Sequence, residues 1–587
     1  MASGGATRLK FVLPRQTKLL KEPWASNATG RAGRIGRMLR RLLPLPLLFL
    51  SLFASAQTIE TPPSTESGRV IKQLVEDSRM EELRWPDFSD YRRHLRNLYA
   101  PIGYAKLWTF NGQPTAQGRT VITLFEAADV KGINSVDYDG TRWQQRLATF
   151  PLRDETALAR FDVAVSITLM RYISDLHIGR INPRNVRFDL DIETKKYYLP
   201  KLLTDIAQSP ENITILTQIE PPYDEYRRLL VALAAYRKMA DDAKDEKPLP
   251  AAKVKPGDSY AALPQLTKML ARMGDLPTTQ QPINSTTVYA EPLVSAVKHF
   301  QQRHGLEPDG VLSEKTFRAL NVPPGRRIRQ IQLALERWRW APSEFASTPI
   351  VVNIPEFRLH AWDDKTGHTA RAMRVVVGQT VSHQTPIFAG DMKYIVFRPY
   401  WNVPPTIQRA EIVPKLEKDR GYLAANNYEI VDDDGKAIGS TVDNATLARL
   451  RTCDLGVRQK PGPANALGLV KFMFPNQNNV YLHSTPSQTL FSRSRRDFSH
   501  GCIRVEDPVA LAAWSLREQP EWTVEKIKAA MEKGDSKTIV LKTPIPIMII
   551  YSTVVVRDDG TVDFYDDIYR HDETLENALA AGYPYPA

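Results

Sequence analysis

Cysteine is scarce in this sequence, with Cys453 and Cys502 the two cysteines among 587 residues. So few cysteines exclude a fold held together by several disulfides. The two could still form one disulfide, or either thiol could be a small buried side chain or a reactive group. Cys453 lies in a polar segment without a catalytic motif beside it, whereas Cys502 directly follows a histidine and a glycine. Cys502 is therefore the candidate for chemistry.

Metal-ligand spacings and long apolar runs are also lacking. The ten histidines and two cysteines show no spacing typical of a metal site, so we expect no metal and no other cofactor. An apolar stretch near the C-terminus, residues 545–556, contains proline and threonine and is shorter than the roughly 20 residues of a membrane helix. This stretch predicts a core strand.

An excess of one charge sign is confined to the N-terminus. The chain has a net charge of +12, and residues 1–41 alone carry +9, which leaves +3 for all the rest. A nearly balanced chain after the N-terminus argues against nucleic acid as a partner.

Residues 1–56 have the pattern of a secretory leader. Two arginines, residues 40–41, precede an apolar run over residues 42–53, and small residues follow at 54–56. These are the n-region, h-region and cleavage site of a signal peptide, with Met38 as an alternative start of the protein. An uncleaved membrane anchor is the other interpretation. In either case the sequence predicts an exported protein that meets a membrane only through this leader.

The length of the remaining chain predicts several domains. Residues 57–246 place apolar residues at helical spacing and predict a helical scaffold domain, and the charged, proline-rich residues 247–258 predict a linker. From residue 348 the spacing changes to that of strands, so residues 348–550 predict a β-rich domain. Residues 551–587 predict C-terminal strands and a tail, with a hairpin turn at Asp559-Gly560.

One segment precedes the β-rich domain and another interrupts it. Residues 324–347 contain an amphipathic connecting helix with Ile331 and Leu335 on its apolar side, and we expect its arginine-rich side to be solvated. Between about 405 and 468 the strand pattern gives way to helical and polar stretches. An insertion of this length just before a catalytic segment predicts a capping lid.

A short module over residues 259–323 predicts three helices, at 263–273, 292–304 and 313–320. Asp309-Gly310 forms a turn and Ser313 is an N-cap residue. The module resembles the bacterial peptidoglycan-binding domain of type 1, at Val297, Phe300, Gln301, His304, Gly305, Leu306, Asp309, Gly310, Val311, Thr316 and Leu320. The alternative is a helical packing module that binds nothing.

The candidate site lies between His483, at the end of a strand, and the tetrapeptide Ser499-His500-Gly501-Cys502. A thiol becomes a nucleophile when an imidazole nearby in space lowers its pKa or takes its proton. Gly501 allows a close backbone approach, and the amides of Gly501 and Cys502 could stabilise an oxyanion. Alternatively, the two histidines are unrelated surface residues and the cysteine is simply buried.

This stretch resembles the YkuD-type L,D-transpeptidase domain, whose pattern is a histidine followed by [S/T]HGC and [IV]R. His483, the tetrapeptide ending at Cys502, and Ile503-Arg504 match it. The order of the parts, with the segments RYISDLHIGRINP and RPYWNVPPTI, is similar to the large YcbB-like subgroup. The resemblance implies an α+β multidomain fold: a helical scaffold, a three-helix peptidoglycan-binding module and a β-rich YkuD-type catalytic domain with a capping insertion.

The resemblance also implies a reaction in the periplasm. Cys502 would attack the third residue of a peptidoglycan tetrapeptide, release D-alanine and form a thioester, which an amine of another stem resolves into a 3→3 cross-link. His483 would be the general base, and the backbone carbonyl of Ser484 would fix its tautomer. Ser499, Gly501 and His500 would form the turn and oxyanion pocket, with His500 in either a scaffold or a second catalytic role.

Three further residues have open roles. Arg504 would pair with a substrate carboxylate or brace the turn through backbone carbonyls, and Trp401 and Tyr481 would be cleft walls or core residues. The partners implied are peptidoglycan stems and glycan, with other wall synthases, in cell-wall organisation and cell shape. Acylation by carbapenems is implied as well.

Three alternatives remain. Attack of water on the same thioester gives an L,D-carboxypeptidase, and attack of a lipoprotein lysine gives a lipoprotein-attaching transferase. The non-enzymatic alternative is a wall-binding scaffold protein, silenced for instance by a Cys453–Cys502 disulfide.

Overall fold

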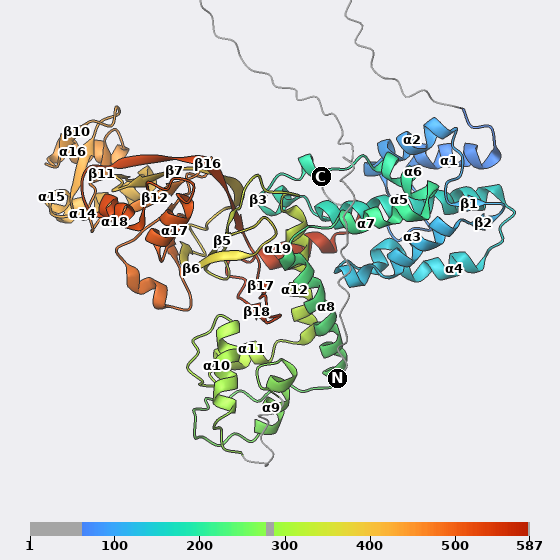
Figure 1. Ribbon diagram of the computed structural model, residues 1–587, viewed down its shortest axis with the longest axis horizontal. Coiled ribbons are helices and arrows are strands. Elements are labelled where there is room, and N and C mark those ends of the chain that lie inside the picture. Colours follow the sequence, from blue (N-terminus) through green and yellow to red (C-terminus); the bar gives the residue numbers. More distant parts are fainter. Residues whose placement is uncertain (1–61, 278–286, 585–587) are drawn as a thin grey trace, which may run out of the picture. The chain divides into compact units, whose positions relative to one another are not determined.

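The computed structural model describes residues 62–277 and 287–584 (Figure 1), so the leader lies outside the described residues. The chain divides into two compact units. Of the described residues, one unit contains 62–127, 135–177 and 193–217, and the other contains 128–134, 178–192, 218–277 and 287–584. Within the described part of the chain, no helix is long and apolar enough to cross a membrane.

The first unit is helical, as the sequence predicts. Its central helix, α5, is buried along most of its length, because apolar residues fall on all of its sides. The elements are α1 (Glu66–Asp77), α2 (Arg92–Tyr99), β1 (Thr109–Phe110), β2 (Gln113–Pro114), α3 (Ala116–Glu126), α4 (Trp143–Ala148), α5 (Glu155–Ile178), α6 (Leu199–Gln208) and α7 (Ile215–Gln218), joined by short 3-10 turns.

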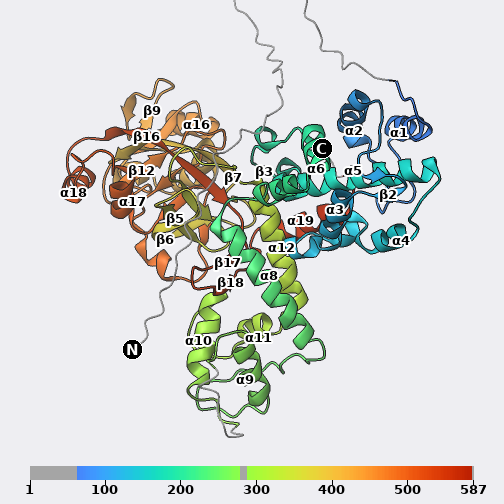
Figure 2. The same cartoon turned by 45° about the vertical axis from the view of Figure 1, so that its right-hand side comes forward.

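The boundary predicted for the scaffold at residue 246 does not coincide with the division of the structure. Helix α8 (Asp224–Asp242) belongs to the second unit, where it lies beside α12 (Pro324–Trp340) in both views (Figures 1 and 2). Leu233 of α8 and Leu335 of α12 share one apolar cluster. Strand β3 (Phe188–Asp189), also within the predicted scaffold range, pairs in parallel with a strand of the C-terminal sheet.

The arginine-rich side of α12 is solvated at its N-terminal end, where Arg326 is exposed, but not at its C-terminal end, so the expectation is wrong for that end. Arg337 is 8% exposed and Arg339 is fully buried. Arg337 Nη1 lies 2.5 Å from the carboxylate of Asp572, and Arg339 pairs with Glu336 at 3.2 Å. Asp572 belongs to α19 (His571–Ala580), a helix that the sequence analysis placed within the tail. The burial is possible because each guanidinium has a carboxylate partner.

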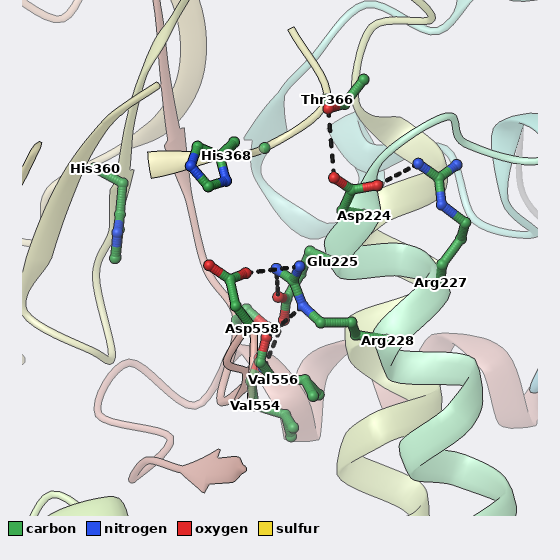
Figure 3. Close-up of polar contacts among 12 residues, drawn as sticks. Asp224, Glu225, Arg227, Arg228, His360, Thr366, His368, Val554, Val556 and Asp558 are labelled. Atoms are coloured by element: carbon green, nitrogen blue, oxygen red, sulfur yellow. Dashed lines mark hydrogen bonds and ion pairs between the residues drawn. The ribbon is translucent and has the colours of Figure 1, made fainter. Parts of the chain in front are cut away.

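A hairpin of β17 (Val554–Val556) and β18 (Val562–Phe564) confirms the turn predicted at Asp559-Gly560. Polar contacts join it to α8 (Figure 3). Arg228 pairs with Asp558 at 2.9 Å and donates to the carbonyl of Val556, while Glu225 accepts from the amide of Val556 at 2.8 Å. These contacts fix α8 to the C-terminal segment.

The short module has three helices, as predicted: α9 (Leu263–Arg272), α10 (Leu293–Arg303) and α11 (Glu314–Leu320). The side chain of Ser313 accepts from the amide of Thr316 at α11's N-terminus, and Asp309 accepts from Val311 in the turn. The module has its own apolar core around Val297 and Phe300.

The β-rich domain is built on a sheet in the order β12-β13-β15-β6-β5-β4-β16-β7-β3, with β14 against β6 and a further β12–β7 pairing that closes the path. Helices α17 (Pro508–Ser515) and α18 (Val524–Glu532) pack on its core. The strands are β4 (Ile350–Asn353), β5 (Arg358–Trp362), β6 (Thr369–Gly378), β7 (Ile387–Phe397), β12 (Val470–Met473), β13 (Leu482–His483), β14 (Asp497–Ser499), β15 (Ile503–Val505) and β16 (Lys537–Ile550). The apolar stretch at residues 545–556 forms the end of β16 and then β17, and residues 551–553 between them lie outside any strand, so the strand prediction is confirmed for most of it.

The predicted insertion is present and has its own apolar core, around Leu416 and Leu450. It also has a four-stranded sheet, β10-β9-β11-β8, which the sequence analysis did not predict. Its elements are β8 (Trp401–Asn402), α13 (Pro405–Ile407), the π-helix η10 (Gln408–Ile412), α14 (Val413–Lys418), α15 (Tyr422–Ala425), β9 (Tyr428–Val431), β10 (Ala437–Gly439), α16 (Asn444–Thr452) and β11 (Gly456–Gln459). We call this insertion the cap.

Candidate active site

Three neighbouring strands bring the candidate residues to one face of the sheet. His483 on β13 pairs with Lys471 on β12 and with Arg504 on β15. Cross-strand partners project to the same face, as do residues two apart on one strand. Tyr481 and Cys502 precede His483 and Arg504 by two residues, and the amide after Cys502 donates to the carbonyl of Tyr481 at 3.1 Å. All five side chains therefore share one surface.

His483 is buried at 4% exposure, and its Nδ1 makes a 2.5 Å hydrogen bond with the carbonyl oxygen of Ser484. Because a carbonyl only accepts, Nδ1 carries the proton and Nε2 presents a lone pair. Burial lowers the pKa of His483 to about 3, with the charges of Arg504 and Lys471 acting in the same direction. The imidazole is therefore neutral at ordinary pH. The contact expected from Ser484 is present, and its part in catalysis stays a prediction.

The Cys502 thiol is partly buried, and this burial raises its pKa above the ordinary value. Hydrogen bonds from Tyr481 and the charges of Arg504 and Lys471 oppose this shift without cancelling it. Sγ lies 3.9 Å from the carbonyl oxygen of Asn479, and among the described residues no hydrogen bond joins it to His483. The resting side chain is a thiol, and catalytic hydrogen bonds often tighten only once substrate is bound.

The turn before Cys502 is held by Ser499, which is 2% exposed. Its Oγ donates to the carbonyl of Cys502 at 2.5 Å and accepts from the amide of Gly501 at 3.2 Å. The Gly501 amide is therefore already hydrogen-bonded inside the turn. Of the two amides expected to stabilise an oxyanion, this leaves the amide of Cys502. That amide meets no acceptor within the described chain.

Gly501 is required by its backbone conformation and not by a close contact. Its φ is +109°, which L side chains rarely adopt, whereas an added Cβ would lie 3.8 Å from the nearest atom, the carbonyl oxygen of Gln384. No other protein atom approaches this glycine closely, and a close approach of substrate stays a prediction. On the other side of the turn, Thr385 Oγ1 donates to the carbonyl of Gly501 at 2.8 Å.

His500 points to the cap. Its Nε2 lies 2.6 Å from the carboxylate of Glu411 on η10, and its ring meets that of His383 edge-on at 4.8 Å. These contacts favour the scaffold role over a second catalytic role. They also join the turn that carries Cys502 to the insertion.

Arg504, Tyr481 and Trp401 lie in three different environments. Within the described residues Arg504 makes no hydrogen bond that would brace the turn, and its Nε is buried without a partner. Tyr481 lies against Cys502. Trp401 is on β8 of the cap, with its ring 6.3 Å from that of Tyr428, so it belongs to the cap's packing. Lys471 is a site residue that the sequence analysis missed, because no motif marks it.

The two cysteines are free, with Cys453 at the end of α16 in the cap. The disulfide alternative is therefore not realised in this structure. Within the described residues no cluster of His, Cys, Asp and Glu could hold a metal ion.

A cavity of about 720 Å³ lies elsewhere in the second unit and includes none of the residues around Cys502. Its charged side chains largely pair with one another, as Glu356 does with His360 and Asp563 with Arg557. It does not change the assignment of the site.

Comparison with known families agrees with this geometry. Residues 347–547 match the L,D-transpeptidase catalytic domain, YkuD, residues 93–233 match a scaffold domain and residues 259–320 match a peptidoglycan binding domain. Residues 347–547 are thus similar to the YkuD family of L,D-transpeptidase catalytic domains.

A Haemophilus influenzae protein that carries the name "Putative L,D-transpeptidase" is 31% identical over 235 residues, which are 39% of this chain and 45% of that protein. The chain thus spans less than half the length of this relative.

Two solved structures were also matched, at low similarity. One is an L,D-transpeptidase from Xylanimonas cellulosilytica, with 15% identity, a TM-score of 0.16 and coverage of 52% of this chain and 100% of the other. The second is a fused zinc-dependent amidase, peptidase and peptidoglycan-binding protein from Clostridium acetobutylicum, with 14% identity, a TM-score of 0.14 and coverage of 51% and 100%. At these scores neither carries an argument.

Proposed function

We propose that this chain is an exported L,D-transpeptidase that forms 3→3 cross-links in peptidoglycan through a thioester on Cys502. The observation that carries the proposal is the arrangement on one sheet face of Cys502, Tyr481 and a neutral His483 whose Nδ1 is held by Ser484. A thiol beside an oriented imidazole is the arrangement that nucleophilic acyl transfer requires.

Acylation uses a tetrapeptide stem as donor. His483 Nε2 takes the thiol proton while Sγ attacks the carbonyl carbon of the third residue, so that an S–C bond forms. The C–N bond to D-alanine then breaks, and the leaving amine receives the proton from His483. The amide of Cys502 stabilises the oxyanion. Removing one such donor typically raises the activation barrier by about 2.7–4 kcal/mol.

Transfer reverses these roles. An amine on the third residue of a second stem attacks the thioester, His483 accepts its proton, and the S–C bond breaks to restore the thiol. The product is an amide between two third-position residues. Attack by water would give the carboxypeptidase outcome, and a lipoprotein lysine would give the attached lipoprotein. The cap, which contacts the catalytic turn through Glu411 and His500, supports a transferase because a covered thioester is shielded from water.

The peptidoglycan binding domain supports the wall as substrate. The leader pattern in residues 1–56 supports export to the periplasm. Other wall synthases remain proposed partners.

The test is mass spectrometry of the purified protein incubated with disaccharide-tetrapeptide units. We expect a dimer that has lost one D-alanine, with its link between two third-position residues. Tripeptide monomer alone would establish the carboxypeptidase, and unchanged substrate would contradict both activities.

Two pairs of variants control this experiment. Cys502→Ala should abolish transfer, whereas Cys453→Ala, in the cap, should keep it nearly intact. His483→Ala should lose far more rate than His500→Ala, because His483 lies on the same sheet face as Cys502 with its Nδ1 held by Ser484, whereas His500 is paired with Glu411. The reverse order would place the base at His500.

A further inference from the structure

Three side chains from adjacent strands form a row next to Cys502. Lys471 on β12 pairs with His483 on β13, and His483 pairs with Arg504 on β15. Cross-strand partners project to the same face of the sheet, so the side chains of Lys471 and Arg504 flank that of His483, and both positive charges lower its pKa. The row is therefore cation, imidazole, cation.

Neither cation has a carboxylate partner. Among the described residues Lys471 makes no ion pair, and its Nζ lies 5.6 Å from the centre of the Tyr481 ring. Arg504 likewise pairs with no carboxylate, and its Nε is buried without any acceptor. Glu411, the acid that contacts the catalytic turn, is already paired with His500 at 2.6 Å. Partly buried charge without a partner is unfavourable, so an anion at this row would be strongly held.

The cysteine is not that anion in the resting protein. Burial keeps the pKa of Cys502 above its ordinary value even with Lys471 and Arg504 acting to lower it. The anion that would compensate Lys471 and Arg504 is therefore a group of the substrate.

The proposed reaction indicates which substrate group this is. The leaving amine takes its proton from His483 Nε2, so in the productive complex it lies beside the imidazole. In a D-amino acid the carboxylate is separated from the amine by a single carbon. A carboxylate so close to His483 falls within reach of the cations on either side.

We propose that Lys471, together with Arg504, binds the terminal carboxylate of the donor stem and thereby selects donors whose scissile bond precedes a free C-terminal D-amino acid. This inference rests on the proposed function and adds Lys471 to it as a specificity-determining residue. A longer stem places an amide where the carboxylate would be and leaves both cations uncompensated.

Carboxylate binding also has a consequence for the base. The positive charges of Arg504 and Lys471 lower the pKa of His483, so a bound anion between them opposes that shift and raises the pKa again. His483 thus becomes a better proton acceptor when a correct donor is present.

The test measures binding, without turnover, in Cys502→Ala protein. Isothermal titration compares the stem tetrapeptide with the same peptide carrying a C-terminal amide in place of the carboxylate. We expect the free acid to bind about tenfold or more tightly, since hydrogen bonds to charged groups contribute of that order. Adding Lys471→Met should remove most of this preference, and Lys471→Arg should retain it.

The matched control is Lys393→Met, which removes an exposed lysine from the neighbouring strand β7 and should leave the preference unchanged. Circular dichroism and the retained preference of Lys471→Arg show that the fold is intact. A preference that survives Lys471→Met, is absent from the Cys502→Ala parent, or is lost equally in Lys393→Met would overturn the inference.

Turnover of the wild-type protein separates this result from the proposed function. If the free-acid preference depends on Lys471 while wild-type protein forms neither dimer nor tripeptide, the carboxylate site stands and the proposed activity fails. If wild-type protein cross-links but Lys471→Met keeps the preference, the activity stands and the role of Lys471 fails.

Discussion

Two opposing effects set the pKa of the Cys502 thiol. Burial disfavours the thiolate, whereas Tyr481, Arg504 and Lys471 favour it, and burial prevails. His483 is neutral for the same physical reason, because burial disfavours the imidazolium. The free protein therefore holds a neutral thiol and a neutral imidazole.

The reactivity of Cys502 should follow this balance. In Cys453→Ala protein, we expect the rate of alkylation by iodoacetamide to keep rising with pH past the ordinary thiol pKa of about 8.5. Lys471→Met and Arg504→Gln should each move the apparent pKa further upward, because both cations favour the thiolate. A rate that levels off below neutral pH would show a resting thiolate instead.

At the scale of elements, the loop before β12 supports the base. Gly468 has φ of +62°, and an added Cβ would lie 2.5 Å from Ser484 Oγ and 2.7 Å from its Cβ. The loop at Gly468 therefore contacts Ser484, whose carbonyl orients His483. The glycine therefore positions the imidazole from outside the site.

Gly468→Ala should lower kcat while the protein remains folded. The displaced Ser484 would carry its carbonyl and the imidazole with it, and a shift of about 1 Å in a catalytic group can cost on the order of 100-fold in rate. The control is Gly390→Ala on β7, where an added Cβ meets nothing within 4 Å. Turnover of Gly468→Ala within twofold of the wild type, with an unchanged circular dichroism spectrum, would rule out this role.

A second element-scale contact joins the cap to the catalytic turn. Glu411 and His500 are both partly exposed, so their ion pair contributes only about 0–1 kcal/mol to stability. We expect Glu411→Gln to leave the thermal midpoint unchanged but to raise the ratio of hydrolysed tripeptide to cross-linked dimer several-fold, because a looser cap admits water. Glu417→Gln, which breaks the pair with Arg451 within the cap, should leave the ratio unchanged. An unaltered ratio in Glu411→Gln would mean that this contact does not control water access.

At the scale of the second unit, the connecting helix α12 is buried along its C-terminal half and packs against other elements, so it is not a surface linker. Arg337 joins it to α19 through the buried Asp572, and α8 packs along it. Its arginines thus stabilise the junction of segments far apart in the sequence.

Arg337→Met should destabilise this unit by about 3–5 kcal/mol, because it leaves the carboxylate of Asp572 buried without its cation. The control is Arg326→Met, also on α12, which breaks a partly exposed ion pair with Glu576 of α19. This variant should lower the free energy of unfolding by less than about 1 kcal/mol. Denaturant unfolding of both variants measures the difference. Equal losses would show that burial of the pair is not what matters.

Features with local signals could be predicted from the chain alone. The helices of the short module follow from apolar spacing, a turn at Asp309 and a cap at Ser313, and the structure places each within two residues of its prediction. The YkuD-type domain followed from a contiguous motif and one upstream histidine, and the family comparison agrees. Such features depend on neighbours along the chain, so they can be recognised without knowing the fold.

Features that depend on partners distant in sequence could not be predicted before the fold was known. Lys471 is an unremarkable strand residue until the register of β12, β13 and β15 sets it beside His483. The arginines of α12 resemble a solvated face until α19 supplies a buried carboxylate, and the Gly501 amide is free to act until Ser499 folds back on it. In each case the energy of a charge or a hydrogen-bond donor is set by what surrounds it, and the surroundings exist only once the chain has folded.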